Sequence, residues 1–82
     1  MKFIVVNNGL YSLENVQSVV PNAVFGSVDK RKGNPYMTYS QSLIISYFGG
    51  GESTITFKGY LAKEALTNDL TRVFNEICEK LK

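Results

Sequence analysis

The period of the hydrophobic and polar positions changes once along this chain, near Leu61. Before that residue, short apolar runs rich in β-branched side chains are separated by turn residues, a pattern typical of β-strands. After it, apolar residues recur every three or four positions, as they do along one side of an amphipathic helix. The pattern therefore predicts several strands followed by one C-terminal helix.

The N-terminal half of the chain predicts a series of short strands. Four runs have the composition of strands: 3–6, 10–13, 16–20 and 23–28. Asn8-Gly9 between the first two runs favours a two-residue hairpin turn, because both central residues of a type I′ turn need a positive φ. Pro21 ends or bulges the third strand, and the run 23–28 is expected to resume it.

The most distinct hairpin is predicted between the runs 42–48 and 53–57, which Gly49-Gly50-Gly51-Glu52 connects. The glycines are interpreted as a permissive turn, because the Gly-Lys-Ser/Thr and the helix of a phosphate-binding loop are missing. Alternation along the first strand of this hairpin places apolar residues on both of its faces. One face has Leu43, Ile45 and Tyr47, and the other has Ile44, Ser46 and Phe48. This strand is therefore expected in the centre of the sheet.

The C-terminal segment predicts an amphipathic helix of about five turns. Its apolar stripe consists of Ala62, Leu66, Leu70, Val73, Phe74, Ile77 and Leu81. Thr67-Asn68-Asp69 favour caps over helix interiors, so any bend in the helix is expected there. Cys78 lies at the edge of the stripe and is expected to pack partly against the sheet.

These elements predict an α+β fold, in which a four- or five-stranded antiparallel meander has one C-terminal amphipathic helix packed on one face. The 82 residues are expected to form a single domain, 1–82, since this length leaves no room for a second core. A domain of this size has a thin margin of stability, which favours self-association.

The composition argues against catalysis. The chain has no histidine and one cysteine, so it lacks an imidazole base and a Ser-His or Cys-His nucleophile pair. Its seven acidic residues are dispersed, and we expect no catalytic residue, no cofactor and no metal. A single cysteine excludes an internal disulfide and indicates a reducing, cytoplasmic setting. No apolar run approaches the ~18 residues of a membrane-spanning helix, so no membrane partner is expected.

The segment Asp29–Ser40 differs from the apolar runs on either side of it. Its candidate binding residues are Lys30, Arg31, Lys32, Tyr36 and Tyr39. It is either a protein-binding loop, because Tyr and Arg are enriched in interface hot spots, or a plain connection. A third interpretation is a site for single-stranded nucleic acid, in which cations contact phosphates and tyrosines stack on bases. The net charge of only +2 weakens this third interpretation.

A second candidate surface is the part of the sheet that the helix leaves uncovered. One helix covers one face at most, so the aromatic side chains of the sheet cannot all lie beneath it. The residues expected to form an exposed interface are Tyr11, Phe25, Tyr47 and Phe48. Such a patch favours self-association, and pairing of edge strands is a second route to a symmetric dimer.

The order of these features also resembles known proteins. An apolar first strand, the motif L-x-x-L-x-N-V at 10–16, the hairpin S-L-I-I-S-Y-F-G-G-G at 42–51 and the closing helix span most of the chain. This pattern resembles very short β-meander-plus-helix proteins of Gram-positive bacteria, their phages and mobile elements. The resemblance implies a phage-borne or mobile-element origin and carries over no functional residue.

We therefore expect a small non-enzymatic binding or adaptor protein that self-associates and acts through protein–protein contacts. Such a binding protein includes the case of an accessory or inhibitor protein encoded by a phage or a mobile element. The alternative is a single-stranded nucleic-acid-binding protein that uses the basic, tyrosine-containing segment 29–40.

Overall fold

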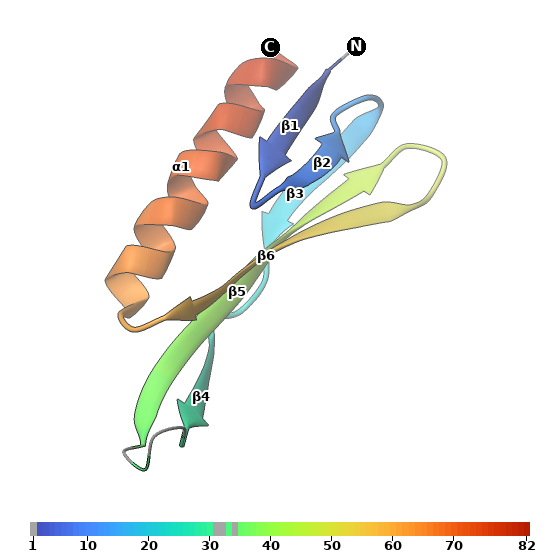
Figure 1. The fold of residues 1–82 in the computed structure, drawn as a ribbon. Coiled ribbons are helices and arrows are strands. Elements are labelled where there is room, and N and C mark those ends of the chain that lie inside the picture. Colours follow the sequence, from blue (N-terminus) through green and yellow to red (C-terminus); the bar gives the residue numbers. More distant parts are fainter. Residues whose placement is uncertain (1, 31–32, 34) are drawn as a thin grey trace.

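Six antiparallel strands precede one C-terminal helix in the computed structural model, which describes residues 2–30, 33 and 35–82 (Figure 1). The strands are β1 (Phe3–Val6), β2 (Gly9–Ser12), β3 (Val16–Pro21), β4 (Phe25–Asp29), β5 (Tyr36–Tyr47) and β6 (Glu52–Tyr60). The helix α1 spans Lys63–Leu81. This is an α+β fold, as predicted. The described strands number six rather than four or five, because the run 23–28 yields a strand of its own.

β1 and β2 form the predicted hairpin, which makes a two-stranded sheet of its own. Val6 lies opposite Gly9, so the turn consists of Asn7 and Asn8. The φ angles of these two residues are 51° and 65°, which are the positive values that a type I′ turn needs. The hairpin is therefore confirmed, but its central residues are Asn7-Asn8 rather than Asn8-Gly9.

β5 lies in the centre of the second sheet, as its two apolar faces predicted. β6 pairs with one edge of β5, and two strands share the other edge. β3 pairs with 43–47 and β4 pairs with 36–40. Asn22 bridges the break between them, since its N–H donates to the Ser42 carbonyl at 2.9 Å and its Oδ1 accepts from the Ser42 N–H at 2.8 Å. β4 therefore resumes the line of β3 beyond Pro21.

The predicted hairpin between 42–48 and 53–57 is present, with strands of 12 and 9 residues that are longer than expected. The turn glycines Gly49, Gly50 and Gly51 have φ angles of 89°, 100° and 94°. Residues with a Cβ rarely adopt these values, so the glycine run forms the turn because the backbone there requires it.

A bulge near the end of β6 changes the width of the sheet. The register of β5 and β6 shifts between Tyr39 and Gln41, and Gly59 has a φ of 81° at this point. Glycine permits this conformation, which is typical of one class of β-bulge. β6 ends at Tyr60, opposite Tyr39, so Tyr36–Thr38 of β5 extend beyond it. The sheet is three strands wide in its middle and two strands wide at the β4 end.

The core lies between the second sheet on one side and α1 with the β1–β2 hairpin on the other (Figure 1). Its buried residues are Ile4, Val6, Leu13, Leu43, Ile45, Ile55, Phe57, Leu66, Leu70, Val73 and Ile77. The helix supplies the last four of these from the predicted stripe. Ala62, which was predicted to belong to that stripe, is instead the exposed N-cap residue.

Two further expectations about the helix differ from the structure. α1 continues without interruption through Thr67-Asn68-Asp69, because Leu66 and Leu70 are buried on either side of this polar segment. Cys78 is exposed, so its predicted packing against the sheet is wrong. Ile77 occupies the buried position, and the next residue along a helix points about 100° away from it.

Candidate protein-binding surface

β4 and residues Tyr36–Ser40 of β5 project from the rest of the molecule as a two-stranded arm (Figure 1). This arm contributes to an elongated shape, with principal extents of 47, 22 and 21 Å. α1 begins at the base of the arm, where the Lys63 Nζ lies 5.5 Å from the centre of the Tyr39 ring. From Thr38 to Tyr36, β5 pairs with no described strand other than β4, because β6 has ended.

The arm presents apolar side chains on both of its faces. Every residue from Ala23 to Met37 whose exposure the structure describes is exposed. The large apolar and aromatic residues of this stretch are Val24 (39% exposed), Phe25 (61%), Val28 (55%), Tyr36 (40%) and Met37 (45%). Strand alternation places Phe25 and Tyr36 on one face, and Val28 lies directly opposite Met37 on the other. Exposed apolar residues gathered on a projecting element are typical of a partner site.

Six of the nine described residues in the segment predicted as a basic excursion, Asp29–Ser40, belong to strands. Asp29 is the last residue of β4, and Tyr36–Ser40 belong to β5. Pairing between these two strands, which local composition does not reveal, turns the segment into the end of a hairpin.

The structure places the three described candidate residues of that segment in two different environments. Lys30 and Tyr36 are exposed near the end of the arm. Tyr39 instead packs against the core at the base of the arm, with the Lys63 ammonium over its ring. The predicted candidates Arg31 and Lys32 lie outside the described residues.

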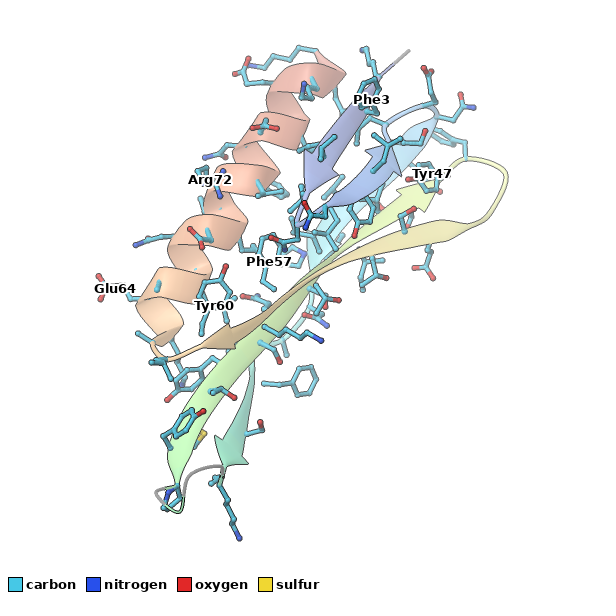
Figure 2. The ribbon with its side chains drawn as sticks, viewed as in Figure 1. Phe3, Tyr47, Phe57, Tyr60, Glu64 and Arg72 are labelled. Carbon is cyan, nitrogen blue, oxygen red and sulfur yellow. The ribbon has the colours of Figure 1, made fainter. Side chains whose placement is uncertain are left out.

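The four aromatic residues predicted to form an exposed interface do not form one patch. Tyr11 and Tyr47 pack against the core, and the Tyr47 hydroxyl donates to the Ser12 carbonyl at 2.7 Å (Figure 2). Phe25 and Phe48 are exposed, at 61% and 66%. Phe25 lies opposite Ser40, and Phe48 directly follows the end of β5 at Tyr47, so nearly the length of seven strand residues, about 23 Å, separates the two.

The sheet face turned away from α1 is mainly polar. Hydroxyl groups face each other across its strands, with Ser42 and Thr56 at 3.2 Å and Ser27 and Thr38 at 3.5 Å. This face therefore lacks the continuous apolar surface that the sequence led us to expect there.

An exposed apolar patch that the sequence interpretation missed lies on the β1–β2 hairpin. Phe3, Val5 and Leu10 are 45%, 62% and 69% exposed, and Val5 lies opposite Leu10. The signal for this patch is the run Phe3–Val6, which is apolar at every position although only Ile4 and Val6 face the core. A strand that is apolar on both faces is typical of a strand covered on both faces, whereas the second face of β1 is exposed here.

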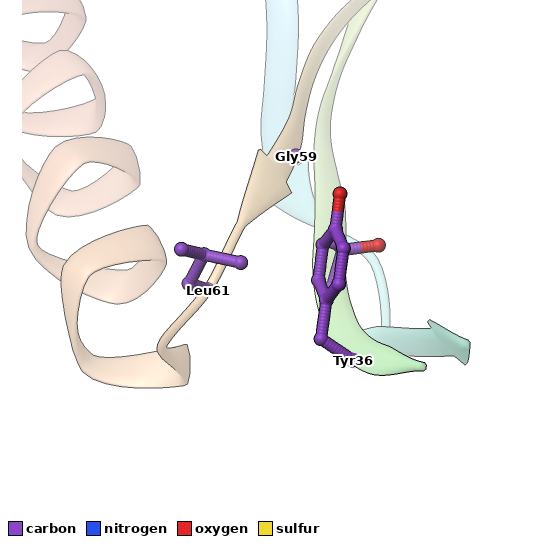
Figure 3. A pocket seen from close by; sticks show the side chains of 4 residues that line it. Tyr36, Gly59 and Leu61 are labelled. Carbon is purple, nitrogen blue, oxygen red and sulfur yellow. The ribbon is translucent and has the colours of Figure 1, made fainter. Parts of the chain in front are cut away.

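A pocket of about 410 Å³ opens beside the base of the arm (Figure 3). Its lining consists of Tyr36, Thr38, Gly59 and Leu61. The pocket lies where β6 leaves β5 at the Gly59 bulge, and the exposed Leu61 forms its opposite wall. The pocket extends the apolar surface of the arm toward the part of the molecule that contains the core.

A hydrogen bond fixes the end of β6 to α1. The Tyr60 hydroxyl donates to the Asp69 carboxylate at 2.7 Å, and Figure 2 shows the Tyr60 side chain directed toward the helix. Burial raises the pKa of Tyr60 above its ordinary value of 10.0, and the hydrogen bond and the negative charge of Asp69 raise it further. This contact holds the strand in place where the arm begins.

We expect Tyr60→Phe to flatten the loss of stability at high pH. Because the pKa of Tyr60 is raised in the folded protein, the unfolded chain loses this proton first as the pH rises. The stabilisation that the protonated Tyr60 contributes is therefore complete below pH 10.0, and it is lost as the pH rises through the raised pKa of Tyr60. Urea unfolding between about pH 9 and pH 11 measures the two slopes, and Asp69→Asn, which removes the charge, gives a control. Equal slopes for wild type and Tyr60→Phe would contradict this prediction.

The fold and these surfaces define a small α+β domain with a projecting, apolar β-arm. No three His, Cys, Asp or Glu side chains gather as a metal site among the residues that the structure describes. In the same part of the chain, no helix is long and apolar enough to cross a membrane. No protein-family model matches this sequence, and no curated protein or solved structure is significantly similar to it.

Proposed function

We propose that this chain is a non-enzymatic binding protein and that its arm makes the protein–protein contact, with another protein or with a second copy. The observation that carries the proposal is that every residue from Ala23 to Met37 whose exposure the structure describes is exposed, including Phe25 and Val28. A two-stranded hairpin without a third strand or a covering helix is at best marginally stable in water. A partner that covers the arm supplies what the chain itself lacks.

The composition supports a binding role over a catalytic one. The chain has no histidine, and its pocket beside the arm is lined by two hydroxyl-bearing side chains, a glycine and a leucine. The resemblance to short phage and mobile-element proteins supports an accessory or inhibitor role in such an element. In that role the arm engages a protein of the host or of the element.

Photo-crosslinking in cells tests the proposal. A photoreactive phenylalanine analogue in place of Phe25 is expected to yield adducts with protein, since this side chain is 61% exposed on the arm. The matched control carries the analogue at Thr71, which is exposed on the helix. Mass spectrometry identifies the adduct, which is either a second copy or another chain.

Two outcomes would count against this function. Equal or absent crosslinking at positions 25 and 71 would show that the arm has no protein partner. Adducts that contain single-stranded nucleic acid would favour the alternative function, for which Lys30 and Tyr36 near the end of the arm are the candidate residues.

A further inference from the structure

The outer edge of β4 is the least protected strand edge in the described sheet. The free edge of β3 carries Pro21 and a register shift between Val16 and Ser18. The free edge of β6 has the Gly59 bulge, and the Thr56 carbonyl accepts a hydrogen bond from the Asn7 side chain at 3.5 Å. Features of this kind hinder the pairing of a further strand with the edge.

β4 has none of these features. Its residues, Phe25–Asp29, include no proline and no lysine, and they pair with β5 in an uninterrupted register. β4 pairs with no strand other than β5 among the described residues. Its outer backbone groups therefore offer a row of hydrogen-bond donors and acceptors to an incoming strand.

We propose that this edge binds a second copy of the chain, so that β4 pairs with β4 of the other copy in the antiparallel direction about a two-fold axis. This inference rests on the proposed function of the arm and names its partner. The two arms then form one four-stranded sheet in the order β5–β4–β4–β5. Each arm gains the additional strands that an isolated hairpin needs for stability.

The chemistry of the edge is self-complementary about such an axis. Antiparallel pairing of identical strands is an isologous contact, in which the same residues serve on both sides. With Gly26 on the axis, Val24 of each copy lies opposite Val28 of the other, and Phe25 lies opposite Ser27. The row formed by Val24, Val28 and Met37 then becomes continuous across both copies. Lys30 lies opposite Asn22, so no like charges face each other in this register.

The size of the arm sets the strength of the dimer. A standard interface uses ~20–30 residues on each side, whereas eleven residues between 23 and 37 are described as exposed. The contact therefore belongs to the small, transient class, with a dissociation constant on the order of micromolar to millimolar. We expect the dimeric fraction of the chain to rise between about 1 μM and about 1 mM.

Sedimentation analysis over this concentration range tests the inference with two matched substitutions. Val28→Lys places a charge on the β4 edge and is expected to raise the dissociation constant at least ~10-fold, because lysine blunts strand edges. Val5→Lys makes the same change at a site of similar exposure, 62% against 55%, on the competing β1–β2 patch. It is expected to leave the dimer unchanged. Thermal unfolding confirms that both variants fold.

Amide hydrogen exchange distinguishes strand pairing from other contacts. The amides of β4 that point away from β5 are expected to become protected at high concentration in the wild type and to remain unprotected in Val28→Lys. A chain that stays monomeric at about 1 mM, a dimer that Val5→Lys alone dissociates, or a dimer without added protection in β4 would each overturn the inference. If the chain is monomeric but Phe25 still crosslinks to a different protein, only this inference fails and the proposed function stands.

Discussion

Replacement of Ile45 by alanine is expected to lower the free energy of unfolding by about 2–5 kcal/mol. Ile45 is 0% exposed in the central strand, opposite Val19 of β3 and Ser53 of β6. Truncation at Cβ removes apolar contacts and leaves a cavity, because the strands on both sides hold their positions through backbone hydrogen bonds. For a domain of this size, a loss of this magnitude removes a large part of the total stability.

The neighbouring residue provides the control for this prediction. Ile44 has the same side chain in the same strand, but it points to the other face of the sheet and is only partly buried. Ile44→Ala is expected to cost less than half as much as Ile45→Ala, since less apolar surface returns to water. Urea unfolding monitored by circular dichroism gives both values. An equal cost at the two positions would mean that the face turned away from α1 is covered as well.

Replacement of Asn68 by proline is expected to lower the free energy of unfolding by about 3 kcal/mol. Asn68 is exposed in the interior of α1, six positions into the helix. Proline there removes one backbone hydrogen bond and its ring clashes with the preceding turn. The helix carries Leu66 and Leu70 of the core on either side of this point, so a break also disturbs their packing.

Two further variants separate this effect from a general intolerance of substitution. Asn68→Ala is expected to raise stability by a few tenths of a kcal/mol, because alanine has the higher helix propensity. Lys63→Pro, at the first helical position after the N-cap Ala62, is expected to cost far less than Asn68→Pro, since the N–H there has no helical acceptor. Thermal and urea unfolding measure all three. A small effect of Asn68→Pro would indicate that α1 is divided at Thr67–Asp69 in solution.

The parts of the fold that were predictable are those in which local chemistry determines the backbone. The glycines at 49–51 require positive φ angles, and they mark the β5–β6 turn without reference to the rest of the chain. The two-sided apolar pattern of Leu43–Phe48 likewise places β5 in the centre of the sheet. The first turn was misplaced by one residue because asparagine and glycine both accept a positive φ. Which two residues form the turn depends on the pairing of Val6 with Gly9.

The part of the arm in the segment Asp29–Ser40 was interpreted as a loop, because its pairing depends on a contact between residues distant in the sequence. Tyr36–Ser40 follow a run of basic and turn residues, and nothing in their own composition shows that they pair with Phe25–Asp29. The same limit applies to the aromatic residues. Alternation separates Tyr47 from Phe48, but the face that is buried depends on where β2 and α1 pack, as the bond from Tyr47 to Ser12 shows.

None of the described core residues lies in the arm, since the buried set passes from Leu13 directly to Leu43. Substitutions at exposed positions such as Phe25 and Val28 are therefore expected to change stability by no more than about 0.5 kcal/mol, whatever they do to binding. Partner choice and the maintenance of the fold thus reside in different parts of one short chain. Mutations in the arm can therefore change the binding partner while the core and the fold stay the same. A few such mutations are enough to give related copies of this protein different partners.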